Sequence, residues 1–174
     1  MPFNQILKEL KKVFSHVEEK DVKIFIQEII AAKRVYVVGA GRSGLIAKNL
    51  AMRLVRVGKD TFVVHETVNP QMKKGDLLVV ISGSGETSDI LDAAKVARVM
   101  GARVISLTAD SQSPIVKISH TTIVIPSQIP KRLGQHYYLR ELIGVPERSA
   151  IKSLFEVCAL IFVEVATSRI NGEK

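Results

Sequence analysis

Apolar residues recur at helical spacing in two segments at the start of the chain. The first stripe, over residues 4–14, consists of Ile6, Leu7, Leu10, Val13 and Phe14, and the second, over residues 21–32, of Val22, Phe25, Ile26, Ile29 and Ile30. Steps of three and four residues place such side chains on one face of a helix. We therefore expect two amphipathic helices, the second with Asp21 at its N-cap.

Beyond residue 33, short apolar runs rich in β-branched residues alternate with segments of helical spacing. The runs predict five strands, at Val35–Val38, Thr61–Val64, Leu77–Ile81, Val104–Leu107 and Thr121–Ile125. Helical patterns occupy residues 45–57 and 88–99. A loop-rich stretch over about 126–148 is followed by a long, very apolar helix over about 149–170.

The predicted strands are apolar on both faces, and most are separated by helical patterns. This arrangement is typical of a parallel sheet covered by helices on both sides. With right-handed crossovers it favours an α/β fold, a three-layer αβα sandwich with a five-stranded parallel sheet. We expect a single domain over residues 1–174, made of N-terminal helices at 1–32, an α/β core at 33–126 and a C-terminal helix at 149–170.

The composition bears on the cellular location of the protein. Hydrophobic residues make up 47% of the chain, yet no run reaches the roughly 18 apolar residues of a membrane span. No hydrophobic signal core follows Met1. The one cysteine, Cys158, has no partner within the chain and lies in an apolar run, so we expect a small core residue rather than a nucleophile. A reducing, cytoplasmic location without membrane attachment fits these features.

The formal net charge of +8 favours anionic partners. Basic residues are spread along the chain, with no basic tail, no helix-turn-helix pattern and no zinc-ligand spacing. Nucleic acid is therefore a weaker candidate than a phosphorylated metabolite.

The first candidate loop, Gly39-Ala40-Gly41-Arg42-Ser43-Gly44, follows a predicted strand and opens a helix. It matches the G-x-G-x-x-G dinucleotide fingerprint, and Glu66 lies near the end of the next strand, where a ribose-binding acid would sit. A nicotinamide-dependent enzyme is thus one hypothesis. Any strand-turn-helix that binds an anion uses the same glycines and helix amides, and a tight turn without ligand is a third interpretation.

The second candidate loop, residues 82–88, reads Ser-Gly-Ser-Gly-Glu-Thr-Ser and also joins a buried strand to a helix. It has four hydroxyls among seven residues, and phosphate is an anion that accepts several O–H and N–H donors at once. Loops on neighbouring parallel strands converge at one edge, where such sheets bind ligands. Neither loop continues into Gly-Lys-Ser/Thr, so a P-loop NTPase is not indicated.

The two loops together resemble the sugar isomerase (SIS) domain family. Within it, Lys48, residues 51–54, His65-Glu66-Thr67 with Pro70, and Gly75-Asp76-Leu77-Leu78 are similar to the 6-phospho-3-hexuloisomerase branch, as is Phe155-Glu156 followed by residues 159–162. The resemblance implies a homo-oligomer, usually a tetramer, that interconverts 3-hexulose 6-phosphate and fructose 6-phosphate without a metal or organic cofactor.

The resemblance also assigns roles to residues. It implies that Ser43, Ser82, Ser84 and Thr87 bind phosphate and that Glu156 is the catalytic base. The loop residues Gly41, Arg42, Gly83 and Gly85 belong to the same expected phosphosugar site. His65, His120 and His136 are candidates for the acid or the ring-opening group, and His65 is favoured because it ends the second strand on the ligand side. Glu66 would bind sugar hydroxyls or a neighbouring subunit, and Tyr137-Tyr138 would close over the site or pack on the domain.

Glu156 has two interpretations. Isomerisation needs a base and donors for the developing oxyanion, and the apolar final helix would raise the basicity of a buried carboxylate. Alternatively, Ser153-Leu154-Phe155-Glu156 fits a capping box, in which Glu156 only caps the helix. A non-catalytic phosphosugar sensor and an aldose–ketose isomerase therefore remain open beside the hexuloisomerase hypothesis.

Overall fold

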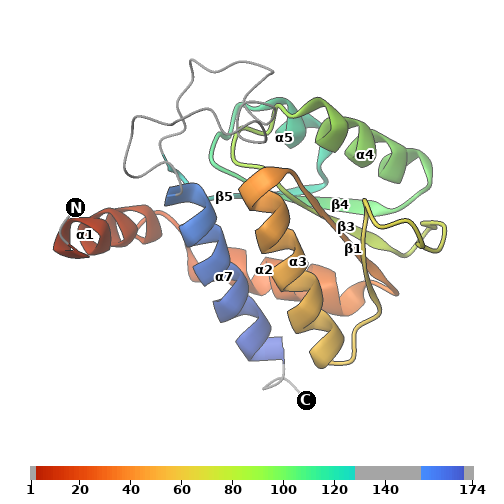
Figure 1. Ribbon diagram of the computed structural model, residues 1–174, viewed down its shortest axis with the longest axis horizontal. Helices are drawn as coiled ribbons and strands as arrows, with labels where there is room; N and C mark the ends of the chain where they lie inside the picture. Colours follow the sequence, from red (N-terminus) through yellow and green to blue (C-terminus); the bar gives the residue numbers. More distant parts are fainter. Residues whose placement is uncertain (1–2, 128–153, 171–174) are drawn as a thin grey trace.

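The computed structural model describes residues 3–127 and 154–170, in which a parallel sheet lies between two layers of helices (Figure 1). The strands are β1 (Val35–Gly39), β2 (Thr61–Val63), β3 (Leu77–Ile81), β4 (Arg103–Thr108) and β5 (Thr121–Val124). Their order across the sheet is β2-β1-β3-β4-β5, and every pairing is parallel. The three-layer α/β fold expected from the sequence is confirmed.

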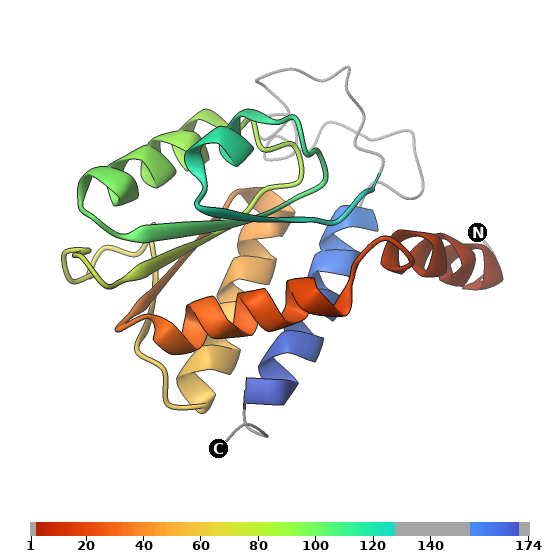
Figure 2. The same ribbon diagram turned by 180° about the vertical axis from the view of Figure 1, so that it is seen from behind.

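The helices divide between the two faces of the sheet (Figures 1 and 2). One layer contains α1 (Phe3–Phe14), α2 (Glu19–Ala31), α3 (Gly41–Arg56) and α7 (Leu154–Ile170), and the other contains α4 (Ser88–Val99) and α5 (Pro114–Ile118). Side chains of each strand alternate between these layers. Val35 and Val37 of β1 pack with α2, α3 and α7, whereas Tyr36 and Val38 pack on the α4 side. Strands buried on both faces explain the unbroken apolar runs.

The connection from β2 to β3 contains no helix, unlike the other crossovers of the sheet. Instead, the Tyr36 ring stacks on Phe62 at 5.2 Å between ring centroids, and its hydroxyl donates a hydrogen bond to the Pro70 carbonyl at 3.0 Å. Aromatic side chains and an extended segment thus cover this part of the sheet.

Two helix starts differ from the sequence expectation. The N-cap of α2 is Glu18 rather than Asp21, which lies at the third helical position and accepts the Glu18 N–H at 2.9 Å through its carboxylate. An acid at either position can join a capping box, so the residue types alone did not distinguish them. The short helix α5 was not expected, because its five residues are too few for a periodic pattern; it begins at Pro114, a residue suited to a first helical turn.

Helix α7 buries most of one of its sides in the core. Its Phe162 ring packs edge-to-face on Phe25 of α2, with ring centroids 5.3 Å apart. Cys158 is fully buried, and burial raises the pKa of its thiol to about 11, which confirms the core assignment. Although α7 is very apolar, Val157 and Val165 remain 40% and 36% exposed. Across the described residues, none of the helices has the length and hydropathy of a membrane span.

Two ion pairs stabilise the amino edge of the sheet, away from both glycine loops. Arg103, at the start of β4, donates to the Glu28 carboxylate of α2, with Nε 2.8 Å from Oε2, and Thr121 donates to the same carboxylate at 3.1 Å. Arg34 forms a second pair with the buried Asp76 through contacts of 3.1 and 2.6 Å. The hydrogen bond from Arg103 lowers the pKa of Glu28 below its ordinary value of 4.5, although burial opposes the shift.

We expect Glu28→Gln to lower stability in a pH-dependent way. A depressed folded-state pKa means that the contribution of Glu28 is present above pH 4.5 and is lost as pH falls through the folded pKa. At pH 7 the loss should be about 1 kcal/mol, or about 2–4 °C in Tm. Thermal unfolding from pH 7 to pH 3.5 measures it. A control, Glu19→Gln, breaks the more exposed pair with Arg169 and should cost less; a Glu28→Gln deficit that persists unchanged at pH 3.5 would contradict this account.

Candidate functional site

The candidate site is set by the register of two neighbouring strands. Gly39, the last residue of β1, lies opposite Ile81, the last residue of β3. The chain then passes to α3 on one face of the sheet and to α4 on the other. The crossovers from these adjacent strands lead in opposite directions across the sheet, to β2 and to β4. Such a switch point opens a crevice at the carboxyl edge, where α/β sheets bind ligands.

The first loop turns directly from strand into helix. The helix begins at Gly41, which has φ 54°, so the expected loop is largely the first turn of α3. A Cβ atom at Gly39 would come within 2.7 Å of the Ser43 carbonyl oxygen, so only glycine fits. Ala40 caps α3 without a side-chain hydrogen bond. The helix N-terminus therefore directs backbone N–H groups and positive dipole toward the crevice.

The second loop presents hydroxyl groups. Ser82 Oγ accepts the Gly85 N–H at 3.2 Å, and Ser84 Oγ accepts the Glu86 N–H at 3.3 Å. Each hydroxyl that accepts in this way keeps its own hydrogen for donation to a ligand. Thr87 is the N-cap of α4 and makes no side-chain cap hydrogen bond. Both helix N-termini at the crevice thus lack a side-chain acceptor, which leaves donors for an anion.

A layer of buried hydroxyl groups supports the second loop from behind. Thr108, at the end of β4, donates through Oγ1 to the Gly83 carbonyl at 3.1 Å, and the Ile115 N–H donates to the Gly85 carbonyl at 3.1 Å. Ser113 lies against Gly85 and is 2% exposed. These bonds occupy the loop carbonyls. The sequence analysis did not identify Thr108 and Ser113. The signal that could have found them is the presence of hydroxyl residues at and after the end of another buried strand.

Packing of α7 along α3 brings Glu156 to the first loop. Its Oε1 lies 3.8 Å from Nε of Arg42, and the two side chains are 15% and 26% exposed. Both residues lie in the first turn of their helices. The sequence led us to expect an apolar setting for Glu156, but the Arg42 guanidinium and helix N-termini adjoin it. Ser153, the partner in the capping alternative, lies outside the described residues.

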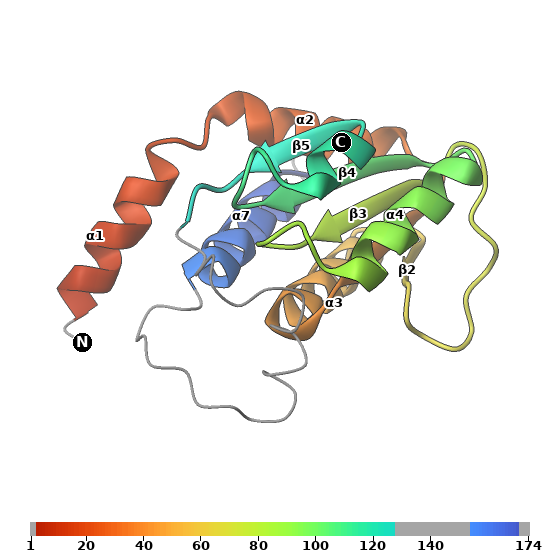
Figure 3. The same ribbon diagram turned by 90° about the horizontal axis from the view of Figure 1, so that it is seen from above.

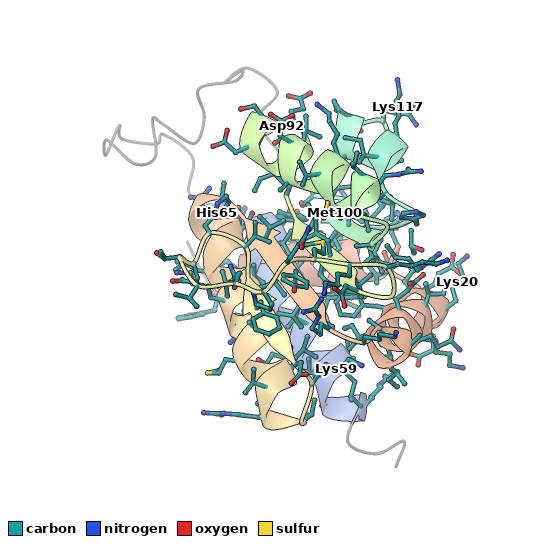
Figure 4. All side chains as sticks on the ribbon, turned by 90° about the vertical axis from the view of Figure 1, so that its right-hand side faces the viewer. Lys20, Lys59, His65, Asp92, Met100 and Lys117 are labelled. Carbon is teal, nitrogen blue, oxygen red and sulfur yellow. The ribbon has the colours of Figure 1, made fainter. Side chains whose placement is uncertain are left out.

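His65 and Glu66 flank the first loop from the neighbouring strand. They follow β2, and both are exposed. The Lys48 ammonium donates to Glu66 Oε1 at 3.0 Å, which ties this turn to α3. Figure 4 shows His65 at the end of the molecule where α3 begins, opposite to Lys59. Their expected roles in catalysis and sugar binding stay predictions.

The other histidine candidates do not join this group. His120 precedes β5, at the amino edge of the sheet, and its Nδ1 accepts the Val104 N–H at 2.9 Å. Burial, together with Arg98 and Arg103, lowers the pKa of its imidazole. His120 was therefore a wrong candidate for the acid. It lies at the amino end of its strand, whereas the candidate site lies at the carboxyl ends of the strands. His136 and Tyr137-Tyr138 lie outside the described residues.

A cavity of about 340 Å³ lies at the opposite, amino edge of the sheet. Its charged lining residues include Glu28, Asp76 and Arg103, which already pair within the fold. It therefore lacks the converging donors of the carboxyl edge. In the described part of the chain, no three His, Cys, Asp or Glu side chains gather in a group that could hold a metal ion.

Residues 28–137, which include both loops and all five strands, match the model of the SIS domain. The chain belongs to the SIS domain family. The match supports the resemblance read from the two loops. Both loops that meet at the switch-point crevice lie within the matched residues.

Individual SIS relatives align over most of the chain. The 3-hexulose-6-phosphate isomerase of Mycobacterium gastri is 33% identical over 156 residues, which are 90% of this chain and 74% of that protein. A Methanococcus jannaschii crystal structure, from which 3-hexulose-6-phosphate isomerase function was inferred, superposes with a TM-score of 0.76 at 32% identity, covering 98% and 86% of the two chains. An Aeropyrum pernix relative is 38% identical over 133 residues, 76% of this chain but 63% of that protein.

We expect Gly85→Ala to disrupt the second loop. Gly85 has φ 61°, and its added Cβ would lie 2.3 Å from Ser113 Oγ and 2.7 Å from Ile115 Cγ2. Left-handed backbone alone costs a residue with a Cβ about 1–2 kcal/mol, and the overlap adds to that cost. Thermal unfolding and fructose 6-phosphate binding measure the effect.

The matched control is Gly58→Ala. Gly58 has φ 83° but no atom within 4 Å of an added Cβ. This variant should lose only the stability that the left-handed backbone costs a residue with a Cβ, and it should still bind the ligand. Equal losses of stability and binding in both variants would show that the contact with Ser113 does not hold the loop.

Proposed function

We propose that the protein is a phosphosugar isomerase that interconverts 3-hexulose 6-phosphate and fructose 6-phosphate through an enediol. The observation that carries this proposal is the convergence of two donor-rich helix starts and the Glu156 carboxylate at one edge of the sheet. The isomerase name of a relative that aligns with 90% of the chain supports the choice of substrate.

The phosphate group would bind between the two loops. Hydroxyls of Ser43, Ser82, Ser84 and Thr87 would donate to its oxygens, with backbone amides around Gly41, Gly83 and Gly85 and the guanidinium of Arg42. A dianion matches this set because each of its oxygens accepts several hydrogen bonds. Binding energy from the phosphate, remote from the reacting carbons, would hold them in place.

Glu156 would act as the base. As a carboxylate, it would take the proton from C2 of the 3-keto sugar while O3 gains a proton, which forms the C2–C3 enediol. It would then return the proton to C3 while the O2 hydroxyl loses its proton, which leaves the 2-keto sugar. Arg42, whose Nε lies 3.8 Å from Glu156 Oε1, would hold this base next to the phosphate site. His65 would supply the acid, and Glu66 would bind sugar hydroxyls.

The sheet order argues against the nicotinamide alternative. Dinucleotide domains of the Rossmann type have the order 3-2-1-4-5-6 and place the fingerprint loop beside the fourth strand. Here the first loop lies beside β3, whose own loop carries the serines. Glu66, the expected ribose acid, is bonded to Lys48. The fingerprint is better explained as one half of a phosphate site.

We also infer that the protein is a cytoplasmic homo-oligomer, a dimer or a tetramer. The single cysteine is buried and unpaired, which suits a reducing compartment. Apolar side chains that remain exposed on α1, α3 and α7 support self-association.

Turnover of fructose 6-phosphate tests the proposed reaction, with the 3-hexulose product removed by a coupled synthase. We expect Glu156→Gln to lower kcat by at least about 10²-fold, because general-base catalysis contributes at least that much, while fructose 6-phosphate still binds. Glu19→Gln, which removes another arginine-paired carboxylate, is the control and should keep full activity. Absence of turnover in the unsubstituted protein, with binding retained, would point instead to a sensor or to an aldose–ketose substrate.

Thermal unfolding with ligands separates the phosphosugar and dinucleotide sites. At one hundred times its Kd, a ligand adds about 2.7 kcal/mol of stability. We expect fructose 6-phosphate to raise Tm and NAD to leave it unchanged. Ser84→Ala should reduce the shift given by the sugar phosphate. Stabilisation by NAD alone would reject the phosphosugar assignment.

A further inference from the structure

The turn that follows β2 carries His65 and Glu66 with little support from secondary structure. β2 has three residues and is an edge strand, and the connection from it to β3 contains no helix. Figure 3 shows this connection, coloured yellow, as a long loop along the outer margin of the molecule. Residues 65–68 are all exposed. A surface segment with so few buried contacts keeps one shape only if hydrogen bonds hold it.

The side chain of Asn69 closes this turn from within. Its Nδ2 donates to the carbonyl oxygens of Val63 at 2.7 Å, Glu66 at 3.0 Å and Val64 at 3.4 Å. Carbonyl oxygens are acceptors, so only the NH2 end of the amide can face all three. The Glu66 N–H also donates to the Val63 carbonyl, at 3.1 Å. One amide group thus gathers the backbone carbonyls on both sides of His65.

Asn69 is itself anchored to β1. It precedes Pro70, and a proline ring restricts the residue before it to extended backbone conformations. The Pro70 carbonyl accepts the hydroxyl of Tyr36 at 3.0 Å, and Tyr36 lies in β1 with 2% of its surface exposed. The first loop leaves the sheet at Gly39, at the end of the same strand. One buried strand therefore anchors both the turn and the first phosphate loop.

We propose that Asn69 is a positioning residue of the proposed site, which holds His65 and Glu66 beside the bound sugar by closing the turn that carries them. The inference rests on the proposed function, in which these two residues supply the acid and bind sugar hydroxyls. The hydrogen bonds that Asn69 donates go to the backbone of the turn. Its loss should therefore spare phosphate binding and impair the steps at the sugar carbons.

The ion pair between Lys48 and Glu66 does not replace this support. The two side chains are 59% and 57% exposed, and ion pairs between such exposed groups are weak and screened by salt. The pair also holds a side chain and not the backbone. Without Asn69, water would solvate the carbonyls of the turn, and the backbone at His65 would take other shapes. A displacement of about 1 Å can lower a rate by about 10²-fold, so catalysis is sensitive to such a change.

Steady-state kinetics with fructose 6-phosphate test this role. Asn69→Asp keeps the shape of the side chain but places an acceptor oxygen against the three carbonyls, and Asn69→Ala removes the amide without adding charge. Both variants should lower kcat/KM by about tenfold or more, while calorimetry shows an unchanged affinity for inorganic phosphate. The control, Gln71→Glu, makes the same change from amide to carboxylate at an exposed position of the same connection and should keep full activity.

Thermal unfolding shows whether each variant is folded. A folded Asn69→Ala variant with unchanged kcat/KM would overturn the proposal. A parallel loss of phosphate affinity would overturn it as well, because Asn69 would then support the phosphate loops and not the turn alone.

Nuclear magnetic resonance of isotope-labelled histidine tests the same role without turnover. The His65 imidazole signals, assigned by their loss in His65→Gln, should shift when fructose 6-phosphate binds to the unsubstituted protein or to Gln71→Glu. In Asn69→Ala at saturating ligand the shift should be several-fold smaller. A protein that binds fructose 6-phosphate without turnover would contradict the proposed reaction, and the His65 signals would still decide the role of Asn69. No shift in the unsubstituted protein, or an equal shift in Asn69→Ala, would overturn that role.

Discussion

The parallel pairing of β1 with β3, in a register that ends both strands at the same level, is the constraint on which the candidate site depends. Because Gly39 lies opposite Ile81, the two loops leave the sheet together. Right-handed crossovers from adjacent strands to opposite sides then place α3 and α4 on different faces. Their N-termini converge on the crevice. A shift of register by even one residue would move the serines of the second loop out of reach of the first helix.

The contact between α3 and α7 brings a carboxylate to the candidate site. More than one hundred residues separate Arg42 from Glu156 in the chain, yet packing brings their charged groups within 3.8 Å. The carboxylate therefore adjoins a cation and helix N-termini at the start of a largely apolar helix. The same pair of helices leaves several apolar side chains exposed on its outer side.

Rigidity behind the loops matters as much as the donors in front of them. The Thr108 hydroxyl donates to the Gly83 carbonyl of the second loop, and Ser113 and Ile115 lie so close to Gly85 that no Cβ fits. A phosphate can then meet hydroxyl and amide donors that are already oriented, without reorganising the loop. Preorganised donors of this kind are more effective than the same groups on a mobile segment.

Sequence alone determined the features that local rules govern. Apolar runs gave the five strands and most helices, and the residues of both loops marked the anion site, because strand ends, glycines and hydroxyls need no distant partner to be recognised. Asp21 as N-cap failed, since neighbouring acids compete for one cap, and α5 was too short for a periodic signal.

Only the tertiary structure decided which residues meet. It separated His120 from the site, because a parallel strand has two ends and the histidine lies at the amino one. It placed Arg42 beside Glu156, revealed Thr108 and Ser113 as supports, and left Val157 and Val165 partly exposed on a very apolar helix. These outcomes depend on contacts between distant segments, and no local pattern of residues encodes their geometry.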